Sequence, residues 1–313
     1  MGETAQIDVI KGHGTGNDFV LLPDPEGTVD LTGQLVRSLA DRHRGIGADG
    51  VIRIATAGVL VDKGVLTDLP GGVRGDDWFM DYRNGDGSVA EMCGNGVRVF
   101  AHALTALSLV GPENCSDDGT LPVGTRAGRR DVRIHSADGV RAEVSVDMGV
   151  PSILGTSTAE LDGVRYDGIG VDMGNPHLAC TVPGLSATDL ESLRVDLPPA
   201  FDRDFFPTGV NLEVVTPLQD GRVHMRVHER GVGETLSCGT GTVAAAVAAS
   251  ADRFVEQGRL RQAWQETVRV TVPGGEVAVT VGADDDGHQI PATLRGPSRL
   301  VFSTTVGTGS VMP

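Results

Sequence analysis

The sequence predicts an α+β fold with two similar domains, each a mixed β-sheet rolled around one central apolar α-helix. The chain has 313 residues, which is long for one core and natural for two domains. Two strongly apolar helical segments lie about half a chain apart, and short β-branched runs occur around both of them. We expect the first domain to comprise residues 1–147 and 299–313 and the second domain to comprise residues 148–298.

The two predicted helices lack a polar face. The first spans about Asn95–Leu109 and is followed by the stop signals Gly111 and Pro112. The second spans about Gly241–Gln257, and residues 242–251 are almost all Ala and Val. A helix without a polar stripe must be enclosed by other parts of the protein. We therefore expect each helix to be wrapped by its sheet.

Strands outnumber helices in the rest of the chain. Runs rich in β-branched residues predict strands at Ala5–Ile10, Asp131–His135, Ala142–Val146, Val223–Val227, Val268–Val272 and Glu276–Val281. Two segments rich in Gly, Asp and Pro, Ala57–Asp77 and Pro112–Arg130, are predicted to be loops or hairpin insertions. No chemistry is assigned to them.

Charge and composition exclude several function classes. A formal net charge of −16 makes nucleic acids and anionic membranes poor partners. No apolar run approaches the roughly 18 residues of a membrane span, and the first residues show no secretory pattern. The four cysteines form no C-x-x-C pair, which argues against a zinc ribbon or a thioredoxin-type motif. We expect a cytoplasmic protein with reduced thiols and no metal site.

Both predicted helices begin with the motif Cys-Gly-x-Gly. It contains Cys93 in the first half and Cys238 in the second half, whereas Cys115 and Cys180 lack such surroundings and are expected to be inert. The two motif cysteines are separated by nearly half the chain. Two similar domains facing each other would place both thiols at one shared cleft, a common location for small-molecule sites.

Thiols at two helix entrances suit a particular reaction. The helix dipole and the unpaired N–H groups of the first turn favour a thiolate. The N–H groups that are unhindered at these entrances belong to Gly94, Asn95, Gly239 and Thr240. They suit a substrate carboxylate and would stabilise the charge that develops as the α-proton leaves, the role of pyridoxal phosphate in other enzymes. With Cys93 and Cys238 acting on opposite faces of one carbon, one thiol removes a proton and the other donates one.

Ordered motifs along nearly the whole chain resemble those of the diaminopimelate epimerase family. In the first half these are Lys11–Phe19, Arg44–Gly50, Asn84–Ser88 and Glu91–Gly96. In the second half they are Met173–His177, Gly209–Asn211, Glu229–Thr235 and Ser237–Gly241. The resemblance implies interconversion of LL- and meso-2,6-diaminoheptanedioate without metal or cofactor, for lysine and peptidoglycan synthesis.

The resemblance also implies roles for individual residues. Cys93 and Cys238 are the acid and base, with Cys93 the base toward the LL substrate. The substrate-binding residues carried over by motif are Asn17, Asn84, Asn175, Asn211 and Arg230. Glu229 is expected near the substrate ammonium, and His177 is expected to support the thiols. The partner is a small-molecule substrate, and we expect a homodimer.

Two positions depart from the family pattern. Gly50 stands where many members carry Gln, and His228 stands where Tyr is frequent. These departures put substrate affinity in question and leave the reaction type unchanged.

Three other functions remain open at this stage. A proline or hydroxyproline racemase shares the fold and the two cysteines, but its first motif reads Met-Cys-Gly-His-Gly, whereas this chain has Asn95. A non-enzymatic thiol redox switch would use the same cysteines for oxidation. A binding protein for amino acids would show affinity without exchange of the substrate α-hydrogen for solvent deuterium.

Overall fold

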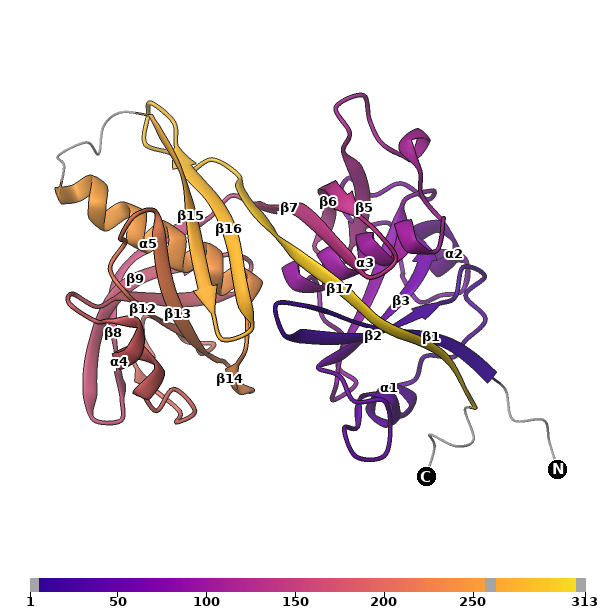
Figure 1. The fold of residues 1–313 in the computed structure, drawn as a ribbon, viewed down its shortest axis with the longest axis horizontal. Coiled ribbons are helices and arrows are strands. Elements are labelled where there is room, and N and C mark those ends of the chain that lie inside the picture. Colours follow the sequence, from indigo (N-terminus) through magenta and orange to yellow (C-terminus); the bar gives the residue numbers. More distant parts are fainter. Residues whose placement is uncertain (1–5, 257–262, 308–313) are drawn as a thin grey trace. The chain divides into compact units, whose positions relative to one another are not determined.

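The computed structural model describes residues 6–256 and 263–307, and the chain divides into two compact units (Figure 1). Unit 1 comprises Met1–Val146 and Pro297–Pro313, and unit 2 comprises Asp147–Gly296. Each unit is a mixed sheet with one long apolar helix, so the predicted fold class is confirmed. Among the described residues, no helix is long and apolar enough to cross a membrane.

Unit 1 is a closed ring of paired strands around one helix. In order of pairing the strands are β1 (Gln6–Gly14), β2 (Asn17–Pro23), β3 (Gly50–Thr56), β4 (Trp78–Asn84), β5 (Leu121–Thr125), β6 (Gly128–Ala137), β7 (Arg141–Gly149) and β17 (Ala292–Gly307). Strand β17 pairs with both β7 and β1 and closes the ring. Helix α3 (Gly94–Ala106) packs on β1, β2, β3, β4 and β6, and its residues 94–104 are all buried. The remaining helices are α1 (Gly33–Ala40), α2 (Ala57–Asp62) and the 3-10 turn η1 (Pro112–Asn114).

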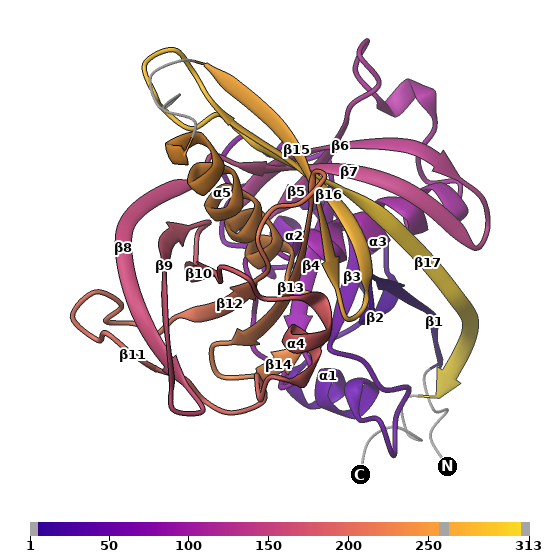
Figure 2. The same ribbon diagram turned by 60° about the vertical axis from the view of Figure 1, so that its left-hand side comes forward.

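In unit 2 the strands also pack around one long helix (Figure 2). Its strands are β8 (Ser152–Leu161), β9 (Val164–Asp172), β10 (Pro176–Thr181), β11 (Ala200–Phe201), β12 (Asn211–Val215), β13 (Arg222–Glu229), β14 (Gly233–Thr235), β15 (Trp264–Val272), β16 (Gly275–Ala283) and the first part of β17. Helix α5 (Gly239–Glu256) packs on β9, β10, β12, β13, β15 and β16. A short helix, α4 (Ala187–Ser192), packs on β13.

The burial of α5 follows from its composition. Every side chain from Val243 to Ala249 is at most 2% exposed. Small Ala and Val side chains let strands approach the helix on several sides, and burying them supplies hydrophobic free energy all around it. The expectation that this helix is enclosed is confirmed.

The predicted elements are present with shifted ends. The helices begin at Gly94 and Gly239, slightly earlier than predicted, because each cysteine caps its helix. The six predicted strands lie within β1, β6, β7, β13, β15 and β16. Two predicted end residues, Ala5 and Gln257, lie outside the described residues.

The interpretation of Ala57–Asp77 as a loop was wrong for its first part. Residues Ala57–Asp62 form α2, whose Leu60 is fully buried in a cluster with Phe79. Packing of this apolar turn outweighs the weak helical propensity of its Gly and Val residues. The segment Pro112–Arg130 contains β5 and the turn into β6, which agrees with a hairpin insertion.

Candidate active site

Cys93 caps helix α3. Its backbone is extended, with φ −145°, and its Sγ accepts the backbone N–H of Gly96 at 3.4 Å. The sulfur thus takes the place that a Ser or Asp oxygen occupies at an ordinary N-cap. This position exposes Cys93 to the positive end of the helix dipole.

Cys238 has the same local arrangement in unit 2. Its Sγ accepts the backbone N–H of Gly241 at 3.4 Å and lies 3.4 Å from Oγ1 of Thr240. The Cys238 side chain is deeply buried, with the residue 7% exposed, whereas Cys93 is half-buried. Each unit therefore presents one thiol at the start of its central helix.

An amide network fixes the surroundings of Cys93. The thiol donates to Oδ1 of Asn17 at 3.5 Å, and Nδ2 of Asn95 donates to the same oxygen at 3.2 Å. The Nδ2 group of Asn17 donates to Asp49 at 2.7 Å. Because Asp49 accepts from the amide nitrogen, the oxygen of Asn17 must face the thiol. The structure brings Asn17 and Asn95 to Cys93.

A charged cluster holds Asp49 in place. Arg42 bonds both Asp18, at 2.8 Å, and Asp49, at 2.7 Å, and Lys11 bonds Asp18 at 2.6 Å. Burial raises the pKa of Asp18, but hydrogen bonds and charges from Arg42 and Lys11 outweigh it and hold that pKa well below its usual value. Asp18 therefore stays a carboxylate and anchors the start of β2.

Arg98 places a buried positive charge one turn along α3 from Cys93. Its side chain is 0% exposed, and it donates to Oγ1 of Thr15 at 3.2 Å and to the carbonyl oxygens of Gly94 and Pro297, each at 3.4 Å. These partners are neutral. Burial lowers the pKa of Arg98 to about 10, and the charge of Cys93 acts in the opposite direction. The guanidinium remains charged at neutral pH and suits a thiolate at Cys93.

In unit 2 the side chain of His177 connects two other polar groups. Its Nδ1 lies 2.7 Å from Oε1 of Glu213, and its Nε2 lies 3.1 Å from Oδ1 of Asn175. The side chains of His177 and Glu213 are both 0% exposed. The structure thus joins Asn175 directly to His177, whose other ring nitrogen binds a buried acid, Glu213, that the sequence did not single out.

The other expected substrate-binding residues have backbone or hydroxyl partners. Asn211 donates to the carbonyl of Pro176 and accepts the backbone N–H of Arg230, each at 2.9 Å. The Arg230 side chain donates to the carbonyl of Thr208 at 2.7 Å. Asn211 therefore ties β10 to the end of β13 and sets the position of Arg230.

Two further residues of this set form hydrogen bonds with hydroxyl groups close to them in the chain. Glu229 accepts a hydrogen bond from the hydroxyl of Thr235. Asn84 donates to the hydroxyl of Ser88 at 3.0 Å.

The expectation that a helix entrance favours a thiolate is wrong for Cys238 in this structure. Burial raises the pKa of Cys238 well above its usual value, and the nearby carboxyl groups of Glu229 and Glu213 raise it further. The hydrogen bonds from Thr240 and Gly241 act in the opposite direction without compensating. Desolvation of a charged sulfur outweighs the helix dipole here. The surroundings of Cys238 in this structure therefore favour the thiol over the thiolate.

The two cysteines outside the motif have ordinary surroundings. Cys180 is 0% exposed in the core of unit 2, and burial raises its pKa. Cys115 is half-buried, and its thiol contacts the carbonyl of Gly111 at 3.9 Å. Neither has the capping geometry of Cys93 or Cys238.

The two departures from the family pattern have local structural partners. A Cβ atom at Gly50 would lie 2.5 Å from the Tyr82 ring and 2.5 Å from the carbonyl oxygen of Arg83, so this backbone leaves no space for a side chain. The ring of His228 bonds the carbonyl of Val195 through Nδ1 at 2.9 Å and is nearly buried. His228 thus fastens β13 to the segment before β11.

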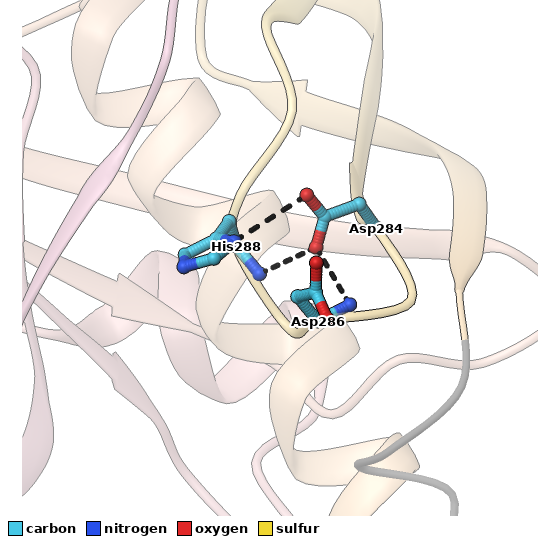
Figure 3. Close-up of side chains that lie close together, drawn as sticks. All are labelled: Asp284, Asp286 and His288. Carbon is cyan, nitrogen blue, oxygen red and sulfur yellow. Dashed lines mark hydrogen bonds and ion pairs between the residues drawn. The ribbon is translucent and has the colours of Figure 1, made fainter.

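One group of metal-binding side-chain types occurs among the described residues. Asp284, Asp286 and His288 lie in the turn after β16 and are all exposed (Figure 3). The Asp284 carboxylate accepts the backbone N–H groups of Asp286 and His288 and lies 3.5 Å from the His288 ring. These contacts account for the cluster as a stabilised turn.

Three residues with a clear place in this geometry are absent from the sequence-based set. They are Asp49, Arg98 and Glu213. Asp49 and Arg98 lie inside or beside quoted motifs, and their charges were the available signal. Glu213 follows Asn211 by two positions in an otherwise apolar strand, and a charge in such a strand was the signal for it.

The chain is similar to known proteins along nearly its whole length. The diaminopimelate epimerase family model matches residues 9–154 and 169–301. Diaminopimelate epimerase of Rhodococcus jostii (strain RHA1) is 54% identical, over 97% of this chain and 98% of its own length. That of Mycobacterium leprae (strain TN) is 52% identical over 93% of each protein.

Solved structures with low sequence identity share the fold. A hydroxyproline epimerase from Agrobacterium vitis has a TM-score of 0.61 at 14% identity, covering 99% of this chain and 96% of that chain. A Bacillus anthracis phenazine biosynthesis protein of the PhzF family also has a TM-score of 0.61 at 14% identity, covering 96% and 99%. Together with the full-length relatives above, the family match establishes that this chain belongs to the diaminopimelate epimerase family.

Proposed function

We propose that this protein is a diaminopimelate epimerase, an isomerase that interconverts LL- and meso-2,6-diaminoheptanedioate in lysine and peptidoglycan precursor synthesis. The observation that supports this proposal most directly is that two thiols cap their helices in the same way. Cys93 and Cys238 each lie at the N-terminus of a buried helix. The Sγ of each accepts the backbone N–H of the residue three positions later. Family membership supports the substrate. We further propose a cytoplasmic homodimer that uses neither metal nor cofactor.

The reaction uses the two thiols in opposite protonation states. From the LL side, the Cys93 thiolate removes the α-proton while the Cys238 thiol donates a proton to the opposite face of the same carbon. Cys93 then carries a proton and Cys238 is the thiolate, so the enzyme is ready for the meso substrate. The Arg98 cation favours a thiolate at Cys93, and the carboxyl groups near Cys238 favour a thiol there. In this structure the Cys93 thiol donates to the Asn17 oxygen, so forming the thiolate requires that oxygen to turn away. The proposal requires both thiols to reach one carbon.

The backbone and amide groups supply the remaining roles. The N–H groups of the two helix entrances would bind the reacting carboxylate and stabilise its developing charge. Those N–H groups belong to Gly94, Asn95, Gly239 and Thr240. We assign the distal amino and carboxylate groups to a set of side chains consisting of Asn17, Asn84, Asn175, Asn211, Glu229 and Arg230. Such directional donors and acceptors would hold one configuration of the second centre.

Solvent deuterium exchange tests this proposal. The wild-type protein should exchange the α-hydrogen of LL-diaminopimelate for deuterium and produce the meso isomer, and Cys93→Ala or Cys238→Ala should abolish the conversion. Cys115→Ala is the matched control and should retain it, because its thiol only contacts a backbone carbonyl.

Two outcomes would replace the proposal. Exchange with L-proline or hydroxyproline but not with diaminopimelate would indicate the racemase. Binding or thiol oxidation without any exchange would indicate an amino-acid binding protein or a redox switch.

A further inference from the structure

Glu213 and His177 form a pair that is sealed from solvent beneath the start of α5. They lie on the neighbouring parallel strands β12 and β10, and both side chains are 0% exposed. The Nδ1 to Oε1 distance is 2.7 Å. The other carboxyl oxygen of Glu213, Oε2, is buried without a hydrogen-bond partner. Such an orphaned oxygen in a native core calls for an explanation.

The hydrogen bonds fix the number of protons in the pair. Oδ1 of Asn175 is an acceptor only, so Nε2 of His177 must carry the hydrogen of their 3.1 Å bond. The short contact between Nδ1 and Oε1 then contains one further proton, located on either His177 or Glu213. In both cases the pair has zero net charge.

Burial keeps that proton in place. Desolvation raises the pKa of Glu213, and the charge and hydrogen bond of His177 offset this only in part. A carboxylate with a partnerless oxygen in a dry core is costly, whereas the shared proton removes the unpaired charge. The shared proton is therefore part of the folded structure of the pair.

The pair is directly adjacent to the thiol of Cys238. A Cβ atom at Gly241 would lie 2.6 Å from Oε1 of Glu213 and 3.3 Å from Sγ of Cys238. The ionisable groups that act on Glu213 or Cys238 include His177, Cys180 and Glu229. Cys180 also lies on β10, and burial raises its pKa, so it stays a thiol. It therefore does not take up the proton shared by Glu213 and His177.

We propose that Glu213 is a positioning residue that shares one proton with His177, holds the Nε2–H tautomer and thereby sets the orientation of the Asn175 amide. With its oxygen bound to His177, Asn175 keeps its Nδ2 group available to donate to a carboxylate. The opposite orientation would present an oxygen and repel that carboxylate. The last step, substrate binding by Asn175, rests on the proposed function.

The imidazole nitrogen signals of protein labelled with ¹⁵N-histidine test this tautomer without any turnover. His177 is assigned by the loss of its signals in His177→Gln. In the wild type, the Nε2 signal should be that of a protonated nitrogen, because Nε2 donates to the Asn175 oxygen. In Glu213→Gln, Nε2 should remain protonated, because the new amide can donate to Nδ1 of His177 and hold the same tautomer.

His228 is the matched control for this measurement. It is also nearly buried in the same unit, but its Nδ1 partner is a backbone carbonyl, so its signals should be identical in the two proteins. An unprotonated Nε2 in the wild type or in Glu213→Gln would overturn the proposal.

Steady-state exchange separates this inference from the proposed function. Glu213→Gln should keep the tautomer and a KM near the wild-type value, whereas Glu213→Leu should raise KM about fivefold to tenfold, the effect of one misdirected hydrogen bond. Equal KM values in both variants would refute the link to Asn175. A wild-type protein that fails to exchange diaminopimelate would refute the proposed function while leaving the nitrogen signals of His177 interpretable.

Discussion

Replacing Gly241 by Ala should destabilise unit 2, because the first turn of α5 has no space for a side chain. The new Cβ would lie 2.6 Å from Oε1 of Glu213 and 3.3 Å from Sγ of Cys238. Glu213 is fully buried and bonded to His177 at 2.7 Å, so it can move away only by stretching that bond. The substitution therefore overpacks the core at the candidate site.

The change in the free energy of unfolding of Gly241→Ala is the balance of three effects. Overpacking costs about 1–3 kcal/mol, and weakening a buried hydrogen bond adds about 1 kcal/mol. Ala favours a helix over Gly by about 1 kcal/mol, which offsets part of this cost. A net loss of about 2 kcal/mol lowers the Tm of a domain of this size by about 4–8 °C.

Thermal unfolding followed by circular dichroism measures this loss. Gly139→Ala is the control, because a Cβ atom there meets nothing within 4 Å, and its Tm should stay near the wild-type value. A Gly241→Ala protein as stable as the wild type would refute the close packing of Glu213 against α5.

Three further outcomes follow from the charges and from the proposed chemistry. Burial raises the pKa values of Cys180 and Cys238, so their contribution to stability is present below about pH 9 and is lost as pH rises beyond it. In Cys180→Ala, Tm should therefore fall less steeply with rising pH than in the wild type. The pKa of Asp18 is lowered, so its contribution is present above about pH 4 and lost as pH falls further, and Asp18→Asn should flatten the acid limb of the Tm curve. Epimerisation should survive dialysis against a chelator and treatment with a carbonyl-trapping reagent; recovery of lost activity by a metal or pyridoxal phosphate would contradict the proposed mechanism.

The helices were predictable because their signal is local. The Ala and Val run of α5 has no polar stripe, and the structure buries Val243–Ala249 almost completely. The Cys-Gly-x-Gly motif likewise predicted both helix starts. The structure explains why one position of the motif is glycine. Because Gly241 has no side chain, Glu213 can pack against the first turn of α5, and the backbone N–H groups there are also unhindered.

The hydrogen-bond partners of the polar site residues were harder to predict from the sequence than the helices. His177 and Glu213 are far apart along the chain, and only the parallel pairing of β10 with β12 brings them together. A charged residue in an apolar strand, such as Glu213, signals a role without naming its partner. The same holds for Asp49, whose contact with Asn17 depends on the packing of β2 against the segment before β3.

The protonation state of Cys238 also could not be predicted from the sequence. A helix entrance predicts a thiolate from local structure alone, but desolvation depends on how completely the rest of unit 2 covers the sulfur. For Cys93, the buried cation that suits a thiolate comes from Arg98 on the same helix, within reach of sequence reasoning.

The most direct test of the central claim, one thiol for each face of the α-carbon, is deuterium exchange by the two serine variants. A serine hydroxyl can still donate a proton but is a poor base at neutral pH. In Cys238→Ser, exchange should persist from LL-diaminopimelate more than from the D centre of the meso isomer, and Cys93→Ser should show the opposite bias. Equal loss of exchange from both substrates in both variants would contradict the assignment of one thiol to each face.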